Sequence, residues 1–210
     1  MASQLETAYL ELQDYLLNLE IIFIEPIDSK LIPDKEDELD MRSYCVLTHA
    51  AFEEFAETVA SFVLEETIER FINFQEISFG LCTILHFNAP KVGSIDEIDI
   101  TYDYISKTLK DIKSTMSTDI RMNNHGTSMK YLKKMLIPLG VTIPSDAYLS
   151  NSLEQLARHR GAFAHSFSKN RIKLLPSPSD LKKYVEDVTV IMGKIYQQVD
   201  NIKFFKYKLK

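Results

Sequence analysis

The sequence is 210 residues long and contains 24 lysines and arginines against 30 aspartates and glutamates, for a formal net charge of −6. Hydrophobic residues make up 45% and charged residues 26%, as in ordinary globular proteins, and only 6 glycines and 7 prolines disfavour a turn-dense all-β fold. Residues 1–105 carry 5 basic and 22 acidic side chains, whereas residues 106–210 carry 19 basic and 8 acidic. The acidic total argues against a protein that coats nucleic acid indiscriminately, but the basic second half leaves room for a local site.

Apolar residues at three- and four-residue spacing predict seven helices along the chain. In chain order these cover about residues 5–24, 41–74, 77–87, 97–116, 127–139, 150–167 and 179–202. Residues 26–40 are acidic and lack periodicity, so we expect a loop there, and residues 203–210 are expected to form a basic, aromatic tail. No stretch alternates strongly enough to require a sheet. The prediction is an all-α fold, a single helical bundle of about six to seven helices that forms one domain over residues 1–210.

Several predicted helix ends carry capping signals. Ser179 and Asp180 are expected to cap the last helix, and Ser152 and Gln155 are capping-type residues near the start of the sixth. Gly140 is expected to end the fifth helix, because glycine readily adopts the left-handed conformation that follows a helix C-terminus.

The cysteines, the histidines and the chain start exclude several kinds of site. Cys45 and Cys82 are too few for a disulfide scaffold or a four-cysteine zinc site, which favours a reducing cytoplasm. Scattered histidines and the lack of a glycine-rich phosphate loop lead us to expect no metal and no cofactor. The N-terminus lacks a basic signal-peptide region, and no apolar run approaches the roughly 20 residues of a membrane span. We therefore expect a soluble, cytoplasmic protein without a membrane partner.

One segment of the sixth predicted helix concentrates side chains that could do chemistry. Two arginines and two histidines lie within eight residues, namely Arg158, His159, Arg160 and His165. At about 100° per residue, Arg160 falls on the apolar side of the helix, where an unpaired charge is costly. His165 is nearly eclipsed with Arg158, seven residues away, but lies about 140° around the axis from Arg160.

These residue types suit the cleavage of a phosphodiester. Histidine exchanges a proton near neutral pH, while arginine can hold a phosphate with two hydrogen bonds and stabilise the charge of a transition state. If the substrate is RNA, its own 2′-OH can be the nucleophile, so no metal is needed. The alternative is that Arg158 and Arg160 pair with acidic residues of the second predicted helix and that His165 is a packing residue.

The stretch Arg160-Gly-Ala-Phe-Ala-His165 resembles the R-x4-6-H signature of the HEPN superfamily, all-α proteins many of which are metal-independent ribonucleases. The turn Asn123-Asn124-His125-Gly126 and the helix after it are similar to the RiboL-PSP-like branch of that superfamily. The segment that begins at His49 also looks like the early helix of that branch, which carries an acidic residue. The resemblance covers about residues 40–200 at the level of helix order.

The resemblance implies that Arg160 and His165 are the catalytic pair. Gly161 departs from the polar residue that often follows the motif arginine. Arg158 followed by His159 offers a second register, R-x6-H, in which the polar neighbour is present and the helical geometry is better.

The resemblance also implies supporting residues near this pair. An acidic residue of the early helix is expected to orient the arginine, and the candidates are Glu53, Glu54 and Glu57. His125 is read as a helix-entry residue that could also line the cleft. Lys130, Lys133 and Lys134 could follow an RNA backbone or form a solvated face.

The implied partners are RNA as substrate and a second copy of the chain. HEPN proteins typically work as homodimers with two motifs facing one another across a cleft, and cleavage leaves a 2′,3′-cyclic phosphate. The implied setting is toxin–antitoxin or antiviral defence, with a cognate antitoxin or a sensor protein as a further partner. Two alternatives stay open: a non-catalytic HEPN module that binds nucleotide, RNA or a protein, and an antitoxin-like or regulatory bundle whose charged halves drive self-association.

Overall fold

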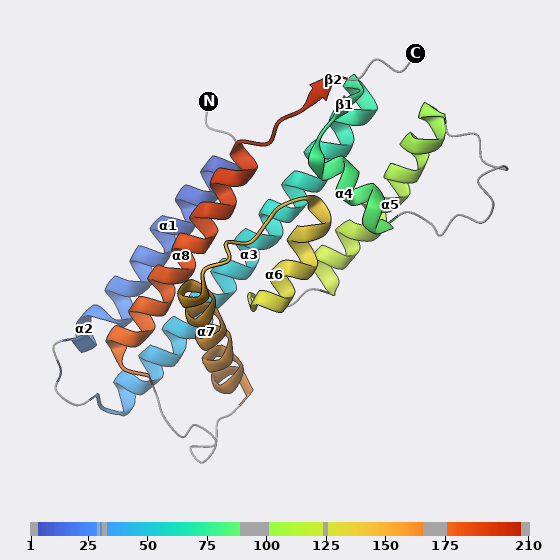
Figure 1. Cartoon of the computed structure of the whole chain (residues 1–210). Helices are drawn as coiled ribbons and strands as arrows, with labels where there is room; N and C mark the ends of the chain where they lie inside the picture. The colour runs from blue at the N-terminus through green and yellow to red at the C-terminus, as the bar shows by residue number, and fades with distance from the viewer. Residues whose placement is uncertain are drawn as a thin grey trace.

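A computed structural model describes residues 4–28, 30, 33–88, 101–123, 126–165 and 176–206. Over these residues the fold contains seven helices of eight residues or more, one further helical turn and a short two-stranded ladder (Figure 1). The helices are α1 (Gln4–Phe23), α2 (Glu25–Asp28), α3 (Lys35–Phe74), α4 (Phe79–Asn88), α5 (Tyr102–Met122), α6 (Met129–Leu136), α7 (Ala147–His165) and α8 (Pro178–Asp200), and the strands are β1 (Glu76–Ile77) and β2 (Phe205–Lys206). The predicted all-α bundle is confirmed. None of the described helices combines the length and the apolar character needed to cross a membrane.

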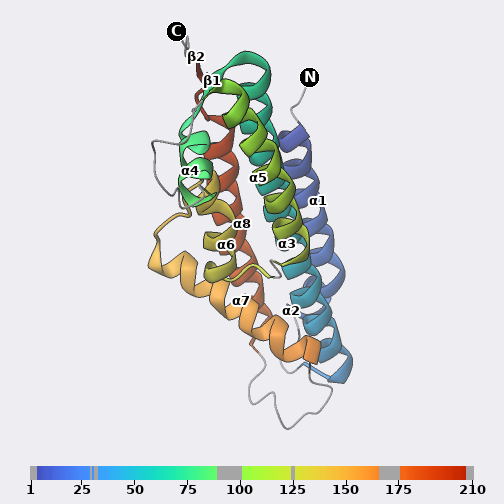
Figure 2. The same cartoon turned by 90° about the vertical axis from the view of Figure 1, so that its right-hand side faces the viewer.

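The 40-residue helix α3 forms the centre of the bundle. Helices α1, α5, α7 and α8 all pack against it, and Figure 2 shows α3 between α5 and α1. Its side chains Tyr44, Phe52, Val59 and Ile68 are fully buried. Burying one such side chain contributes about 1.5–3 kcal/mol, so the position of α3 is fixed by packing on several sides.

The predicted acidic loop at residues 26–40 is wrong at both ends. Glu25–Asp28 forms the turn α2, and α3 begins at Lys35, six residues before the predicted start. The acidic residues at the end of this segment instead start a helix. The side chain of Asp34 accepts hydrogen bonds from the amides of residues 36 and 37, and the side chain of Asp37 accepts one from the amide of Asp34. Lys30 contacts Asp37 at 2.6 Å and ties the connecting segment to this capping box.

Helices α7 and α8 also begin earlier than their predicted caps. Asp146, not Ser152 or Gln155, caps α7, since its carboxylate accepts the amides of residues 148 and 149 at 2.9 and 3.1 Å. Ser152 is instead buried and donates a 2.6 Å hydrogen bond to Asp187 of α8. Ser177 caps α8, and Asp180 completes its capping box from inside the helix.

The predicted stop at Gly140 is confirmed and has a second cause. After α6, residues Ile137–Leu139 form a 3-10 helix that ends at Gly140 with φ 78°. A Cβ at Gly140 would lie 2.9 Å from the Cα of Gly80 in α4, so both the backbone angle and the close approach require glycine. Helix α5 runs on to Met122, six residues past the predicted end, while its predicted start at residues 97–100 lies outside the described residues.

The start of the predicted tail forms part of the fold. Glu76 pairs with Lys206 and Ile77 with Phe205 in an antiparallel ladder, although the sequence predicted no strand. The guanidinium carbon of Arg70 lies 4.4 Å from the ring centroid of Phe204, which adds a cation–π contact beside the ladder. These contacts attach the chain after α8 to the end of α3, and residues 207–210 lie outside the described part.

Candidate functional site

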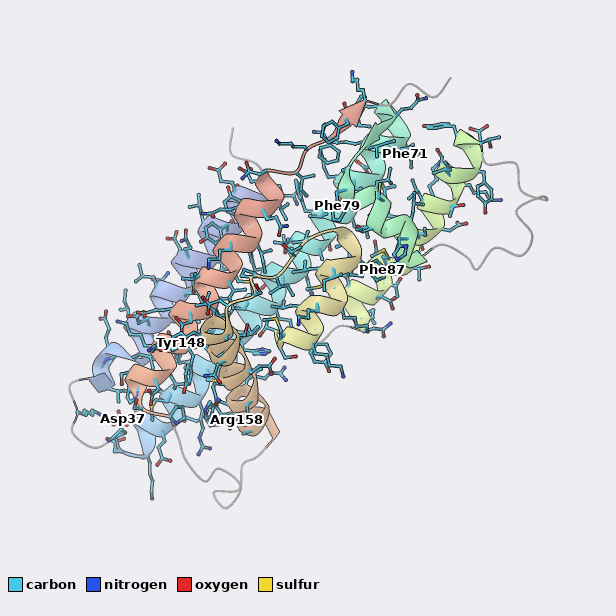
Figure 3. The ribbon with its side chains drawn as sticks, viewed as in Figure 1. Asp37, Phe71, Phe79, Phe87, Tyr148 and Arg158 are labelled. Atoms are coloured by element: carbon cyan, nitrogen blue, oxygen red, sulfur yellow. The ribbon has the colours of Figure 1, made fainter. Side chains whose placement is uncertain are left out.

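Helix α7 presents its two candidate arginines on opposite sides. Arg158 is exposed and lies in the C-terminal half of α7 (Figure 3), whereas Arg160 is half-buried. The guanidinium of Arg160 acts electrostatically on two buried residues of α3: its charge adds to the effect of burial in lowering the pKa of His49, and it partly opposes burial, which raises the pKa of Cys45. Arg160 makes no ion pair or hydrogen bond with any residue that the structure describes. An arginine in this position can accept an anion without first losing a carboxylate partner.

His49 is a neutral, buried hydrogen-bond acceptor. The residue is 2% exposed, and its Nε2 accepts a hydrogen bond from the amide of Thr127 at 3.4 Å. The ring proton therefore sits on Nδ1, which faces the carboxylate of Glu53 at 3.9 Å. Burial, reinforced by the charge of Arg160, lowers the pKa of His49 to about 4.

Three side chains hold the turn that precedes α6. The amide of Gly126 donates to the Glu53 carboxylate, the amide of Thr127 donates to His49, and the amide of Met129 donates to Glu154 of α7 at 2.8 Å. Gly126 has φ 116°, a conformation that favours glycine. The end of the N-H-G turn is thus fixed against α3 and α7.

The thiol of Cys45 belongs to the same interface but has no chemical role that its environment supports. It is fully buried and contacts the carbonyl of Leu156 in α7 at 3.8 Å. Burial raises the pKa of Cys45 to about 12, so the thiolate needed for nucleophilic chemistry is absent at neutral pH. Cys45 therefore packs α3 against α7.

A comparison with protein families identifies the family of this chain. The family model RiboL-PSP-HEPN matches residues 8–201, nearly the whole chain. The chain belongs to the RiboL-PSP-HEPN family. Comparisons with curated proteins and with solved structures gave no match. Membership of the HEPN family marks the chain as a nuclease or an RNA-related module.

The acidic candidates of this HEPN chain are separated by the structure. Glu53 lies on the face of α3 that holds the turn, whereas Glu54 is exposed and lines a groove between α3 and α1. Glu57 lines an adjoining hollow of the same groove, which also includes Arg121 of α5. Of these three, Glu53 contacts the turn at Gly126.

Of the three candidate histidines, the structure describes the side chain of His159 alone. His159 is half-buried, and its ring lies 5.8 Å from that of Phe163 and 6.3 Å from that of Tyr184. Burial, followed by the charge of Arg158, lowers the pKa of His159. Helix α7 continues through His165, which the helical register places on the side of Arg158, but the side chain of His165 lies outside the described part. His125 also lies outside the described residues.

Sequence reasoning missed two residues that contact α7 or the turn. The guanidinium carbon of Arg42 in α3 lies 5.7 Å from the ring centroid of Phe163, and Glu154 caps α6 from α7. A signal for the first was available, because Arg42 begins a series with Cys45, His49 and Glu53 at three- and four-residue spacing on one face of α3. Among the described residues, no three His, Cys, Asp or Glu side chains converge to hold a metal ion.

Proposed function

We propose that this RiboL-PSP-HEPN protein is a metal-independent endoribonuclease whose catalytic pair is Arg160 and His165. In this mechanism the 2′-oxygen of RNA attacks the adjacent phosphorus, and the bond from phosphorus to the 5′-oxygen breaks. The products are a 2′,3′-cyclic phosphate and a 5′-hydroxyl end. His165 removes or donates the transferred proton as a general base or acid, and Arg160 binds the phosphate and stabilises its developing charge.

The observation that carries the proposal is the environment of Arg160. It is half-buried beside a neutral histidine and has no described carboxylate partner. By contrast, Arg70 forms ion pairs with both Glu66 and Glu76, as expected of a structural arginine. The alternative that Arg160 forms a structural ion pair with an acidic residue of α3 therefore has no support among the described side chains. Arg158, which is exposed on the same side as residue 165, remains the competing motif arginine.

The proposed active form is a homodimer. Residues 160 and 165 are about 140° apart around a helix axis, so the pair converges poorly within one chain. Two copies that face each other across a cleft can bring Arg160 of each chain toward the other chain's His165. We further propose a cytoplasmic location, which the two free cysteines, Cys45 and Cys82, favour. We also propose a toxin–antitoxin or antiviral setting with a cognate antitoxin or a sensor as partner, as the HEPN resemblance implies.

The test is cleavage of total RNA in EDTA, with analysis of the ends. We expect wild type to leave 2′,3′-cyclic phosphates, and Arg160→Ala and His165→Ala each to lower the rate at least a hundredfold, since either change removes a group that acts in the transition state. The matched control is Arg121→Ala, an exposed arginine on α5, which should cleave at the wild-type rate.

Three results would redirect the assignment. Full activity of Arg160→Ala with loss in Arg158→Ala would move the motif arginine to Arg158. Absence of cleavage by folded wild type would favour a non-catalytic module that binds nucleotide, RNA or protein, a reading that the apolar Gly161 after the motif arginine also favours. A strict monomer by light scattering at micromolar concentration would contradict the shared cleft.

A further inference from the structure

A groove runs along α3 and is lined by residues of α1, α3 and α5. Figure 2 shows these three helices with α3 between the other two. The groove consists of two hollows, of about 370 and about 320 Å³, that share Glu54 and Thr58 as lining residues. The hollows therefore adjoin one another along α3. The candidate nuclease residue Arg160 lines neither of them, so the groove is a separate feature.

The floor of the groove combines small side chains with larger apolar ones, and it is more apolar in the hollow beside Ala50 and Ala51 than in the hollow beside Ser61. Helix α3 contributes residues from Leu47 to Phe62, and α1 contributes residues on one side of its helix. The floor residues are Leu5, Ala8, Leu12, Leu47, Ala50, Ala51, Phe55, Thr58, Ser61 and Phe62. Small residues at a surface let another backbone approach closely. From Leu47 to Glu65 the groove follows about 27 Å of helix, or about five turns.

The rim of the groove is acidic. Glu11 of α1 and Glu54, Glu57 and Glu65 of α3 line it, against the single cation Arg121. Glu65 shares Lys113 with a neighbouring glutamate at 3.1 Å. Glu11 and Glu54 make no ion pair with any residue in the described ranges. The rim therefore carries carboxylates that a cationic partner can neutralise, and it repels the phosphates of RNA.

We propose that this groove is the docking site for an amphipathic helix of a partner protein. The apolar face of that helix rests on the floor, and lysines or arginines beside this face meet the carboxylates of Glu11 and Glu54. A second copy of the chain fits less well. Its most basic helix, α6, has only eight residues and spans about 12 Å, less than half the length of the groove. The proposal does not depend on ribonuclease activity.

The chain contains no tryptophan, which gives a specific way to observe docking. The probe is a synthetic helical peptide of about 18 residues, a length of about 27 Å. It carries leucine and alanine on one face, lysines on both flanks and one tryptophan on the apolar face. Docking on the floor transfers this tryptophan from water to an apolar surface, so its emission shifts to the blue and its anisotropy rises. Attraction by charge alone leaves the emission maximum unchanged.

The variants separate the groove from general acidity. Glu11→Lys/Glu54→Lys should weaken peptide binding at least tenfold, and Ala50→Phe, which fills the groove from an exposed position, should weaken it similarly without a change in charge. The matched control is Glu25→Lys/Asp111→Lys, which makes the same change in net charge at two exposed carboxylates outside the groove. It should bind within twofold of wild type. A second peptide with glutamate in place of each lysine should not bind.

Several outcomes would overturn the proposal. The first is the absence of a blue shift with wild type, and the second is equal weakening by the groove and control variants. If Ala50→Phe binds the peptide normally, the floor is not the contact surface. If Ala50→Phe instead converts a wild-type dimer into a monomer in light scattering, the occupant is a second copy of the chain.

Discussion

At the scale of single residues, His49 couples protonation to folding. Its pKa is about 4 in the folded chain, because of burial and then the charge of Arg160, against about 6.5 when unfolded. Between these pH values the unfolded chain binds more protons than the folded chain, so stability falls as pH drops from 6.5 to 4. At 1.36 kcal/mol per pKa unit, the free energy of unfolding falls by about 3 kcal/mol over this range. Urea unfolding across this range measures the loss.

Two substitutions at the same position separate titration from hydrogen bonding. His49→Gln keeps an acceptor for the amide of Thr127 but does not titrate, so it should flatten the pH dependence relative to wild type. His49→Leu should also remove the titration, yet it leaves a buried amide unpaired and costs about 1–3 kcal/mol at pH 7. An unchanged slope in both variants would show that His49 titrates normally in the folded chain.

At the scale of helices, two glycines should respond oppositely to the same substitution. Gly161 lies inside α7, and a Cβ there would meet no atom within 4 Å, so Gly161→Ala should stabilise the chain by about 0.5–1 kcal/mol. Gly140→Ala should destabilise it, because φ 78° and the 2.9 Å approach to Gly80 both resist a methyl group. Thermal unfolding of both variants tests the contrast. A lower midpoint for Gly161→Ala would mean that this face of α7 is closely packed against another molecule.

The helices also show what local sequence patterns contain and what they omit. Apolar spacing located the long helices and placed Arg160 on the inward side of α7, since both follow from a repeat of 3.6 residues. It missed the start of α3, because acidic residues near Asp34 suit a solvated loop and a capped helix end equally. It missed Glu154 as the cap of α6, because that contact joins residues 25 positions apart. Pairings between helices depend on how the bundle packs, and the local period does not encode packing.

At the scale of the whole molecule, the uneven charge separates two surfaces with different expected partners. The acidic groove lies over α1 and α3, whereas Lys133 and Lys134 are exposed on α6, next to the turn and to α7. The long acidic first half thus discourages RNA from binding on the groove side, while the exposed lysines of α6 leave a basic surface outside the groove.

This arrangement predicts that RNA affinity depends on where lysines are removed. Each lysine that contacts a phosphate of single-stranded RNA contributes about 0.7 to the slope of log K against log salt. Lys133→Ala/Lys134→Ala should therefore weaken RNA binding and lower the slope by about 1.4 in magnitude. Lys107→Ala/Lys110→Ala, which removes two exposed lysines from α5, should leave the slope unchanged because these lie away from α6 and α7. Anisotropy titrations at several salt concentrations measure the RNA affinity and the salt slope of both variants. Equal losses of affinity in the two variants would mean that RNA binding depends on net charge rather than on the α6 surface.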